Sequence, residues 1–152
     1  MITIKRTNSN NPDFINLVRD LDKYLAITDG EEHDFYDQFN KLDRIKHVVL
    51  IYNDRKIIGC GALKHSTPNK MEIKRMYVKP EFRKSGYASK ILEILKQWAI
   101  ELGYQICVLE TGSRQTEAIA LYYRNHYKVI PNYPPYENRQ NSLCFEKKLH
   151  SV

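Results

Sequence analysis

The chain lacks the features that mark membrane, secreted and metal-binding proteins. Its longest aliphatic run, residues 48–51, is far too short to cross a bilayer. No apolar stretch follows Met1, so we expect no signal peptide and no membrane partner, and we expect a cytoplasmic protein. The five histidines show no ligand spacing with cysteines or carboxylates, which predicts no metal site.

Cysteine is scarce, with three residues, Cys60, Cys107 and Cys144. An odd number in three separate β-prone runs does not suit a disulfide framework. Buried, reduced thiols in a cytoplasmic protein are therefore the preferred interpretation. No histidine lies beside any of the three in the sequence, which argues against a catalytic cysteine.

Long runs of one charge are also missing, although the net charge is +6 and the chain has eleven tyrosines. Basic and aromatic residues together can indicate a nucleic-acid-binding protein. Here the basic residues are dispersed and no recognition-module motif occurs, so we expect no nucleic-acid partner. A positive surface also suits a protein that binds a cofactor with several phosphates.

The whole chain, residues 1–152, reads as one domain in which strands and helices alternate without a linker, a repeat or a low-complexity segment. Such alternation predicts a mixed sheet with helices on both faces. We expect strands at residues 1–7, 47–52, 56–65, 71–78, 105–111, 127–131 and 142–149. We expect helices at residues 12–27, 35–42, 88–102 and 115–122.

The most informative stretch is residues 71–103, which read as a strand, a short basic loop and a long amphipathic helix. Pro80 closes the strand. At the start of a helix, free N–H groups and the helix dipole attract an anion, basic side chains add charge, and Gly86 permits a close backbone approach. The loop that predicts pyrophosphate binding consists of Arg83, Lys84, Ser85, Gly86, Tyr87 and Ala88.

Two motifs in the chain resemble those of the GNAT acetyltransferase superfamily. The family's pyrophosphate loop reads (Q/R)-x-x-G-x-(G/A), which Arg83, Gly86 and Ala88 match in register. Its second motif, a strand ending in Leu-Glu and a helix carrying Ala-x-x-Leu-Tyr, matches residues 105–122. The chain departs from the family at His126, where a glycine usually ends the helix, but histidine tolerates left-handed backbone, so we expect the turn to persist. The alternative for the loop is an ordinary strand-to-helix turn with solvated basic residues.

The resemblance implies an α/β GNAT fold, with a mixed, mostly antiparallel central sheet of about six or seven strands flanked by about four helices. It implies acetyl-CoA as the co-substrate and no metal. In the family, the strand before the loop and the strand after it splay apart, and free main-chain groups hold the thioester. The implied acetyl-CoA contacts outside the loop are the backbone at Met76, Tyr77 and Val78 and the side chain of Gln115 against the pantetheine arm.

Three catalytic residues are also implied by the resemblance. Tyr122 lies twelve residues after Glu110, which is the spacing of the family's general-acid tyrosine, and a phenol can protonate a leaving thiolate. Glu72 and Glu110 each match a glutamate base from one branch of the family, and the sequence does not separate them. As alternatives, Tyr122 packs the helix onto the sheet and Glu72 pairs with Lys74 on the same strand face.

The implied reaction is direct attack of a primary amine on the acetyl thioester in a ternary complex. The acceptor would meet the acidic residues 29–36 and the aromatic residues 132–137, which suit a cationic amine. An acidic helix start that complements its dipole explains the first segment equally well. A small-molecule amine is the first choice, and a protein N-terminus, a peptide lysine or a non-catalytic acyl-CoA-binding module are the alternatives. Whether the chain forms a homodimer stays open.

Overall fold

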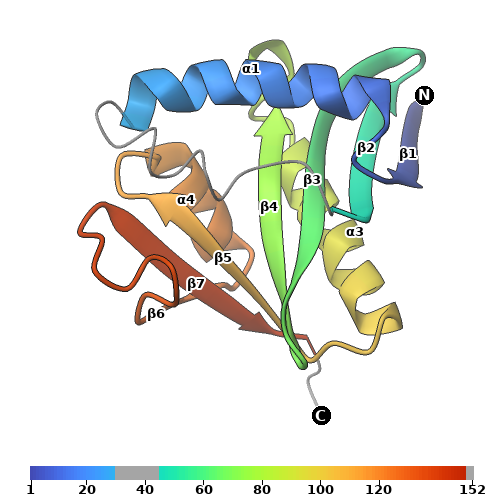
Figure 1. Ribbon diagram of the computed structural model, residues 1–152. Helices are drawn as coiled ribbons and strands as arrows, with labels where there is room; N and C mark the ends of the chain where they lie inside the picture. Colours follow the sequence, from blue (N-terminus) through green and yellow to red (C-terminus); the bar gives the residue numbers. More distant parts are fainter. Residues whose placement is uncertain (30–44, 150–152) are drawn as a thin grey trace.

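Figure 1 shows the computed structural model, which describes residues 1–29 and 45–149. Seven strands form one sheet in the order β1-β2-β3-β4-β5-β7-β6. The strands are β1 (Ile2–Thr7), β2 (His47–Asn53), β3 (Lys56–Thr67), β4 (Lys70–Val78), β5 (Ile106–Gly112), β6 (Lys128–Ile130) and β7 (Ser142–Lys148). The α-helices in the described ranges are α1 (Pro12–Asp29), α3 (Tyr87–Glu101) and α4 (Thr116–Arg124).

Helices cover both faces of the sheet, because its central strands are apolar on both sides. Successive strand residues point to opposite faces, and Val48 and Val49 of β2 accordingly belong to two different cores. Val48 packs with Phe14 of α1, whereas Val49 lies in the cluster that contains Leu95 of α3 and Leu121 of α4. The sheet therefore lies between α1 on one face and α3 with α4 on the other (Figure 1).

Strands β4 and β5 form the parallel pair of the sheet, and the other neighbouring strands are antiparallel. Their pairing covers only residues 70–72 of β4 and residues 106–108 of β5. Beyond these residues the two strands diverge, as Figure 1 shows, and a wedge opens in the middle of the sheet. This is the splay that the family resemblance implies.

Local sequence signals account for the helix ends. The Asn11 side chain accepts a hydrogen bond from the N–H of Asp13 at 2.9 Å, and Pro12 begins α1. Gly103 follows α3 with φ 90°. His126 follows α4 with φ 68°, so the left-handed turn predicted there is confirmed although no glycine is present.

The expected fold class is confirmed, with strand and helix boundaries within a few residues of the predicted ones. The second of the four predicted helices, at residues 35–42, lies outside the described residues. No helix in the described part of the chain is long and apolar enough to cross a membrane. Cys60, Cys107 and Cys144 are buried and carry free thiols, as predicted.

Candidate active site

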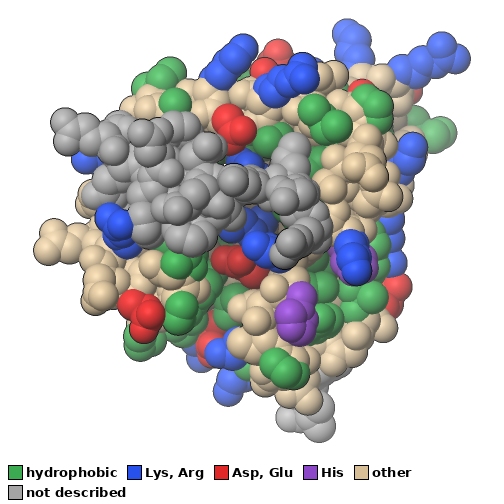
Figure 2. Space-filling model, in the orientation of Figure 1, with side chains coloured by type: hydrophobic (Ala, Val, Ile, Leu, Met, Phe, Trp, Pro, Cys, Tyr) green, Lys and Arg blue, Asp and Glu red, His purple; other side chains and the backbone are tan. Residues whose placement is uncertain are grey.

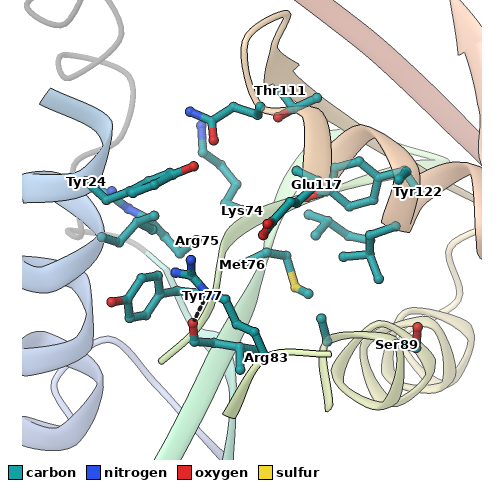
Figure 3. A pocket seen from close by; sticks show the side chains of 18 of the residues that line it. Tyr24, Lys74, Arg75, Met76, Tyr77, Arg83, Ser89, Thr111, Glu117 and Tyr122 are labelled. Atoms are coloured by element: carbon teal, nitrogen blue, oxygen red, sulfur yellow. Dashed lines mark hydrogen bonds between the residues drawn. The ribbon is translucent and has the colours of Figure 1, made fainter. Parts of the chain in front are cut away.

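A cavity of about 410 Å³ occupies the wedge between β4 and β5. Its walls come from the whole second half of β4, from the loop before α3, from α4 and from the end of α1 (Figure 3). Figure 2, in the orientation of Figure 1, shows Lys or Arg side chains beside Asp or Glu side chains at the centre of this face. Regions that are far apart in the sequence thus share one hollow, and it contains both signs of charge.

A bulge in β4 shapes the cavity wall. The register with β3 shifts between the pairs Cys60–Tyr77 and Ala62–Lys74, so β4 carries one extra residue there. Arg75 takes up the extra length with φ 59°, and the Cys60 thiol donates a hydrogen bond to the Arg75 carbonyl at 3.2 Å. Burial raises the pKa of this thiol to about 12, so it stays a protonated donor at neutral pH.

The loop between β4 and α3 presents backbone to the cavity. Lys84 and Gly86 both have positive φ, 63° and 83°, and Gly86 is the N-cap residue of α3. A Cβ added at Gly86 would meet no described atom within 4 Å, so the space in front of the helix start is open. A helix of 15 residues that begins at an open, basic turn offers free N–H groups to an anion.

Arg83 is anchored rather than extended into solvent. Its Nε donates a hydrogen bond to the Val78 carbonyl at 2.8 Å. Its guanidinium lies over the rings of Tyr77 and Tyr24, at 5.6 Å and 5.7 Å from the ring centroids. Arg83 therefore ties the loop to the end of β4 and to α1, and places a fixed positive charge at the cavity mouth.

Gln115 contributes a buried donor to the opposite wall. It is the N-cap residue of α4, is 8% exposed and lines the cavity. Its Nε2 has no hydrogen-bond partner within the described ranges. A buried donor without an acceptor costs about 1–3 kcal/mol, which a bound molecule with a carbonyl group would offset.

Glu72 lies at the β5 end of the cavity and is engaged on both oxygens. The Tyr133 hydroxyl donates a hydrogen bond to Oε2 at 2.8 Å, and Lys74 Nζ lies 3.9 Å from Oε1. The pairing of Glu72 with Lys74 is thus present, as one interpretation of the sequence expected. Burial lowers the pKa of Lys74, and the charges of Glu72 and Glu110 oppose that shift.

Tyr122 of α4 and Glu110 of β5 both line the cavity, and they are close enough for the charge of Glu110 to act on the phenol. Tyr122 is 5% exposed, lines the cavity and stacks at an angle against Tyr127 and Phe145. Burial, and next the charge of Glu110, raise the pKa of the Tyr122 phenol above its ordinary value. In Figure 3 the ring of Tyr122 reaches from α4 toward β4. The phenol is therefore a protonated donor at neutral pH.

The structure brings nearly all of the predicted site residues to this one cavity. The residues that line it are Tyr122, Glu110, Glu72, Met76, Tyr77, Val78, Arg83, Lys84, Gly86, Tyr87, Ala88 and Gln115. Ser85 does not line it; this exposed side chain lies 3.5 Å from the carbonyl of Arg83 and is not part of the wall.

Arg75 and Tyr24 are among the wall residues that sequence reasoning missed. Arg75 had a signal: Met71 and Ile73 are buried, so strict alternation would place Arg75 on the same apolar face, and a charge there indicates a bulge. Tyr24 had a weaker one, since it extends the buried stripe of α1 one turn beyond Leu21.

Comparisons with known proteins agree with this geometry. Residues 13–127 match the family described as Acetyltransferase (GNAT) family. An IAA acetyltransferase of Azospirillum brasilense is 28% identical over 150 residues, which cover 97% of this chain and 98% of that protein.

Solved structures show the same fold. A Klebsiella pneumoniae protein, provisionally named an acyl-CoA N-acyltransferase, superposes with a TM-score of 0.82 at 28% identity and covers 99% of both chains. The PaiA N-acetyltransferase of Thermoplasma acidophilum, solved in complex with coenzyme A, gives a TM-score of 0.73 at 20% identity and covers 97% of this chain and 99% of that one. With its splayed strands, its basic loop at the start of α3 and a family match over most of its length, the chain belongs to the GNAT acetyltransferase family.

Proposed function

We propose that this acetyl-CoA-dependent N-acetyltransferase acts on the primary amine of a small molecule, by direct attack on the thioester in a ternary complex. The observation that carries the proposal is the continuity of the cavity. One hollow runs along β4 from the loop before α3 to Glu72 and Glu110, with Tyr122 in its wall. Donor and acceptor can therefore occupy it together, so no covalent acetyl-enzyme is needed.

The residues present fit acetyl-CoA, which supplies an activated acyl thioester when it is bound. The turn at Lys84 and Gly86 and the start of α3 would hold the pyrophosphate. The buried Nε2 of Gln115 would donate to an amide carbonyl of the pantetheine arm, which explains a donor that lacks a partner in the described part of the protein. Backbone N–H groups at residues 76–78, beyond the bulge, would stabilise the thioester oxygen.

Glu110 is the better general base of the two glutamates. Tyr133 and Lys74 engage both oxygens of Glu72, so removing a proton from an amine would compete with two existing contacts. Glu110 also lies near Tyr122, because its charge contributes to the raised pKa of that phenol. Base and acid would therefore act close together, where nitrogen attacks and sulfur leaves.

The proton balance follows from these roles. Glu110 accepts a proton from the acceptor's ammonium group, and the neutral amine nitrogen forms a bond to the thioester carbon. The carbon–sulfur bond breaks, and Tyr122 donates its proton to the departing thiolate. The raised pKa of Tyr122 keeps the phenol protonated until that moment. Glu110 passes the ammonium proton to solvent, and the second proton that the nitrogen loses as the amide forms returns to Tyr122, so each turnover releases one proton.

We place the enzyme in the cytoplasm. Support comes from the three cysteines, which lie in β3, β5 and β7 as buried, free thiols. Reducing compartments keep thiols in this state.

The experiment that tests the proposal follows thiol release from acetyl-CoA in the presence of either small primary amines or peptides with a free N-terminus or lysine. We expect turnover with small amines, together with formation of the acetylated amine by mass spectrometry. Turnover with peptides alone would contradict the choice of acceptor. Tight acetyl-CoA binding without any transfer would contradict catalysis itself.

A further inference from the structure

Arg75 lies in the cavity wall, and the mechanism above does not use it. The bulge carries it, with φ 59°, on the α1 side of β4. Its side chain is 4% exposed, and Nη1 donates to Asp22 Oδ1 at 2.7 Å. Its Nε is fully buried and has no hydrogen-bond partner among residues 1–29 and 45–149. The Nε edge of the Arg75 guanidinium, beside the cavity, therefore lacks a hydrogen-bond acceptor in the described part of the chain.

A second buried cation stands next to it in the chain. The side chain of Lys74 is 7% exposed and also lines the cavity. The charge of Arg75 is one of the causes that lower the pKa of Lys74, so the two cations are close enough to repel each other. Two adjacent buried cations are costly to hold together, and within the described ranges the Nε of Arg75 still lacks an acceptor that an added anion would supply.

The carboxylates of the site lie close to these cations. Glu72 accepts from Tyr133 and lies near Lys74, Glu110 lies toward Tyr122, and Asp22 takes one nitrogen of Arg75. The cavity wall therefore holds both signs of charge, with the cations at residues 74–75 and the carboxylate of Glu110. A ligand with separated charges of both signs fits this arrangement better than a simple cation does.

We propose that the acceptor is an amino carboxylate, a small molecule whose carboxylate binds Arg75 and Lys74 while its amine faces Glu110. The proposal rests on the proposed function. A carboxylate suits the planar edge of a guanidinium and carries a single charge. A phosphate would bring about two negative charges beside Glu72 and Glu110, and repulsion disfavours it.

The reaction leaves the carboxylate unchanged. The amine nitrogen forms a bond to the acetyl carbon, the carbon–sulfur bond of the thioester breaks, and the proton lost by the amine balances the proton gained by the thiolate. The products are an N-acetyl amino carboxylate and free coenzyme A. Arg75 and Lys74 act on binding and orientation, which predicts effects on KM more than on kcat.

The test uses matched acceptors that differ only at the carboxylate. Each of a set of amino acids is compared with its carboxamide and with its decarboxylated amine, by thiol release at saturating acetyl-CoA. We expect the free amino acid to exceed both analogues by about 10- to 100-fold in kcat/KM for at least one side chain, as hydrogen bonds to charged groups allow. Binding of the corresponding N-acetyl amino acid and its amide to the enzyme–coenzyme A complex, by calorimetry, gives a second readout that needs no turnover.

Arg75→Met and Lys74→Met should each reduce this preference by about tenfold and raise the KM of the amino acid, with the carboxamide unaffected. Lys64→Met is the matched control, because Lys64 is an exposed cation whose charge acts on Lys74 but which does not line the cavity. If Arg75→Met fails to fold, as a thermal melt will show, Lys74→Met alone carries the comparison.

The possible outcomes distinguish failure of the amino carboxylate proposal from failure of the proposed function. Equal use of amino acid and carboxamide, or a preference that survives in both variants, overturns the amino carboxylate. So does the absence of both turnover and binding for every carboxylate while simple amines are acetylated. Failure to bind acetyl-CoA, or transfer to no amine of any kind, instead overturns the proposed function.

Discussion

The cavity has a left-handed turn and a helix start at its α3 end, whereas charged side chains from two strands gather at its β5 end. At the first, a left-handed turn through Lys84 and Gly86 leads into the free N–H groups of α3. At the second, Glu72, Lys74 and Glu110 gather from two strands. A ligand bound by backbone tolerates many side-chain changes, but one bound by side chains is chosen by them. The comparison predicts that side-chain changes alter acetyl-CoA binding less than they alter the choice of acceptor.

The largest expected effect lies where the two ends meet. Tyr122→Phe should lower kcat by about 10²- to 10⁴-fold and leave the Kd for acetyl-CoA nearly unchanged, because the hydroxyl matters only as sulfur departs. Steady-state kinetics and calorimetry measure the two quantities. Tyr127→Phe is the matched control: its hydroxyl is buried, lacks a partner within the described part of the chain, and lies outside the cavity wall. A variant of Tyr122 that melts lower but keeps its kcat would mean that the tyrosine only packs.

The next effect tests the β5 end. Glu110→Gln should lower kcat/KM at neutral pH by about 10²-fold and remove the part of its rise with pH that reports deprotonation of the base. Glu72→Gln should keep that rise, since Glu72 already accepts from Tyr133 and lies near Lys74. The pH profiles of the two variants are the measurement. If both variants kept the wild-type dependence of kcat/KM on pH, the amine would lose its proton to water rather than to either glutamate.

A third effect tests the backbone end. Gly86→Asp should weaken acetyl-CoA binding by about 10- to 100-fold, because the new carboxylate would face the pyrophosphate and a side chain is strained at φ 83°. Gly103→Asp controls for backbone strain, since Gly103 has φ 90°, an equally open Cβ position and no place in the cavity wall. Calorimetry should show weaker acetyl-CoA binding in Gly86→Asp alone, whereas the melting temperatures of both variants should fall by similar amounts. Equal acetyl-CoA affinities of the two variants would show that the pyrophosphate does not bind at this loop.

The smallest expected effect concerns stability at the charged end. Burial lowers the pKa of Lys74 below its unfolded value of 10.5, so the folded state holds its proton less tightly than the unfolded state does. The cost of charging Lys74 is fully present below the folded pKa and vanishes as pH rises past 10.5. Lys74→Met should therefore raise the melting temperature at pH 7, and the gain should shrink toward pH 10.5. Lys64→Met removes an exposed charge that acts on Lys74 only as a secondary cause, so it should show a smaller pH dependence. A loss of stability at pH 7 in Lys74→Met would show that the ion pairs of Lys74 outweigh the cost of its burial.

The difference between the α3 end and the β5 end of the cavity also explains which features could be predicted from the sequence. The turn at Gly86 is local, because proline, basic residues, a glycine and an amphipathic helix follow one another within about twenty residues, and each has its own conformational preference. The order of strands and helices is likewise written in short-range periodicity, which explains why the fold was predicted well.

The charged end depends on long-range contacts. The bond from Tyr133 to Glu72 joins residues 61 positions apart, and the pair of Arg75 and Asp22 joins residues 53 apart. The bulge that places Arg75 in the cavity wall depends on the register of β3 against β4, and its local signal, one charge on an apolar strand face, does not show what Arg75 meets in space. The choice between Glu72 and Glu110 could not be made from the sequence for this reason, since it depends on which neighbours each carboxylate meets in space.

The short contact between β4 and β5 has a mechanical consequence. Three residue pairs connect the half of the sheet made by β1 to β4 with the half made by β5, β7 and β6. Acetyl-CoA seated in the wedge would bridge the two halves and act as a removable brace. Amide hydrogens of residues 73–78 and 109–112 should then exchange more slowly once it binds. At a concentration of about 100 times the Kd, the bound form should resist unfolding by about 2.7 kcal/mol more than the free form.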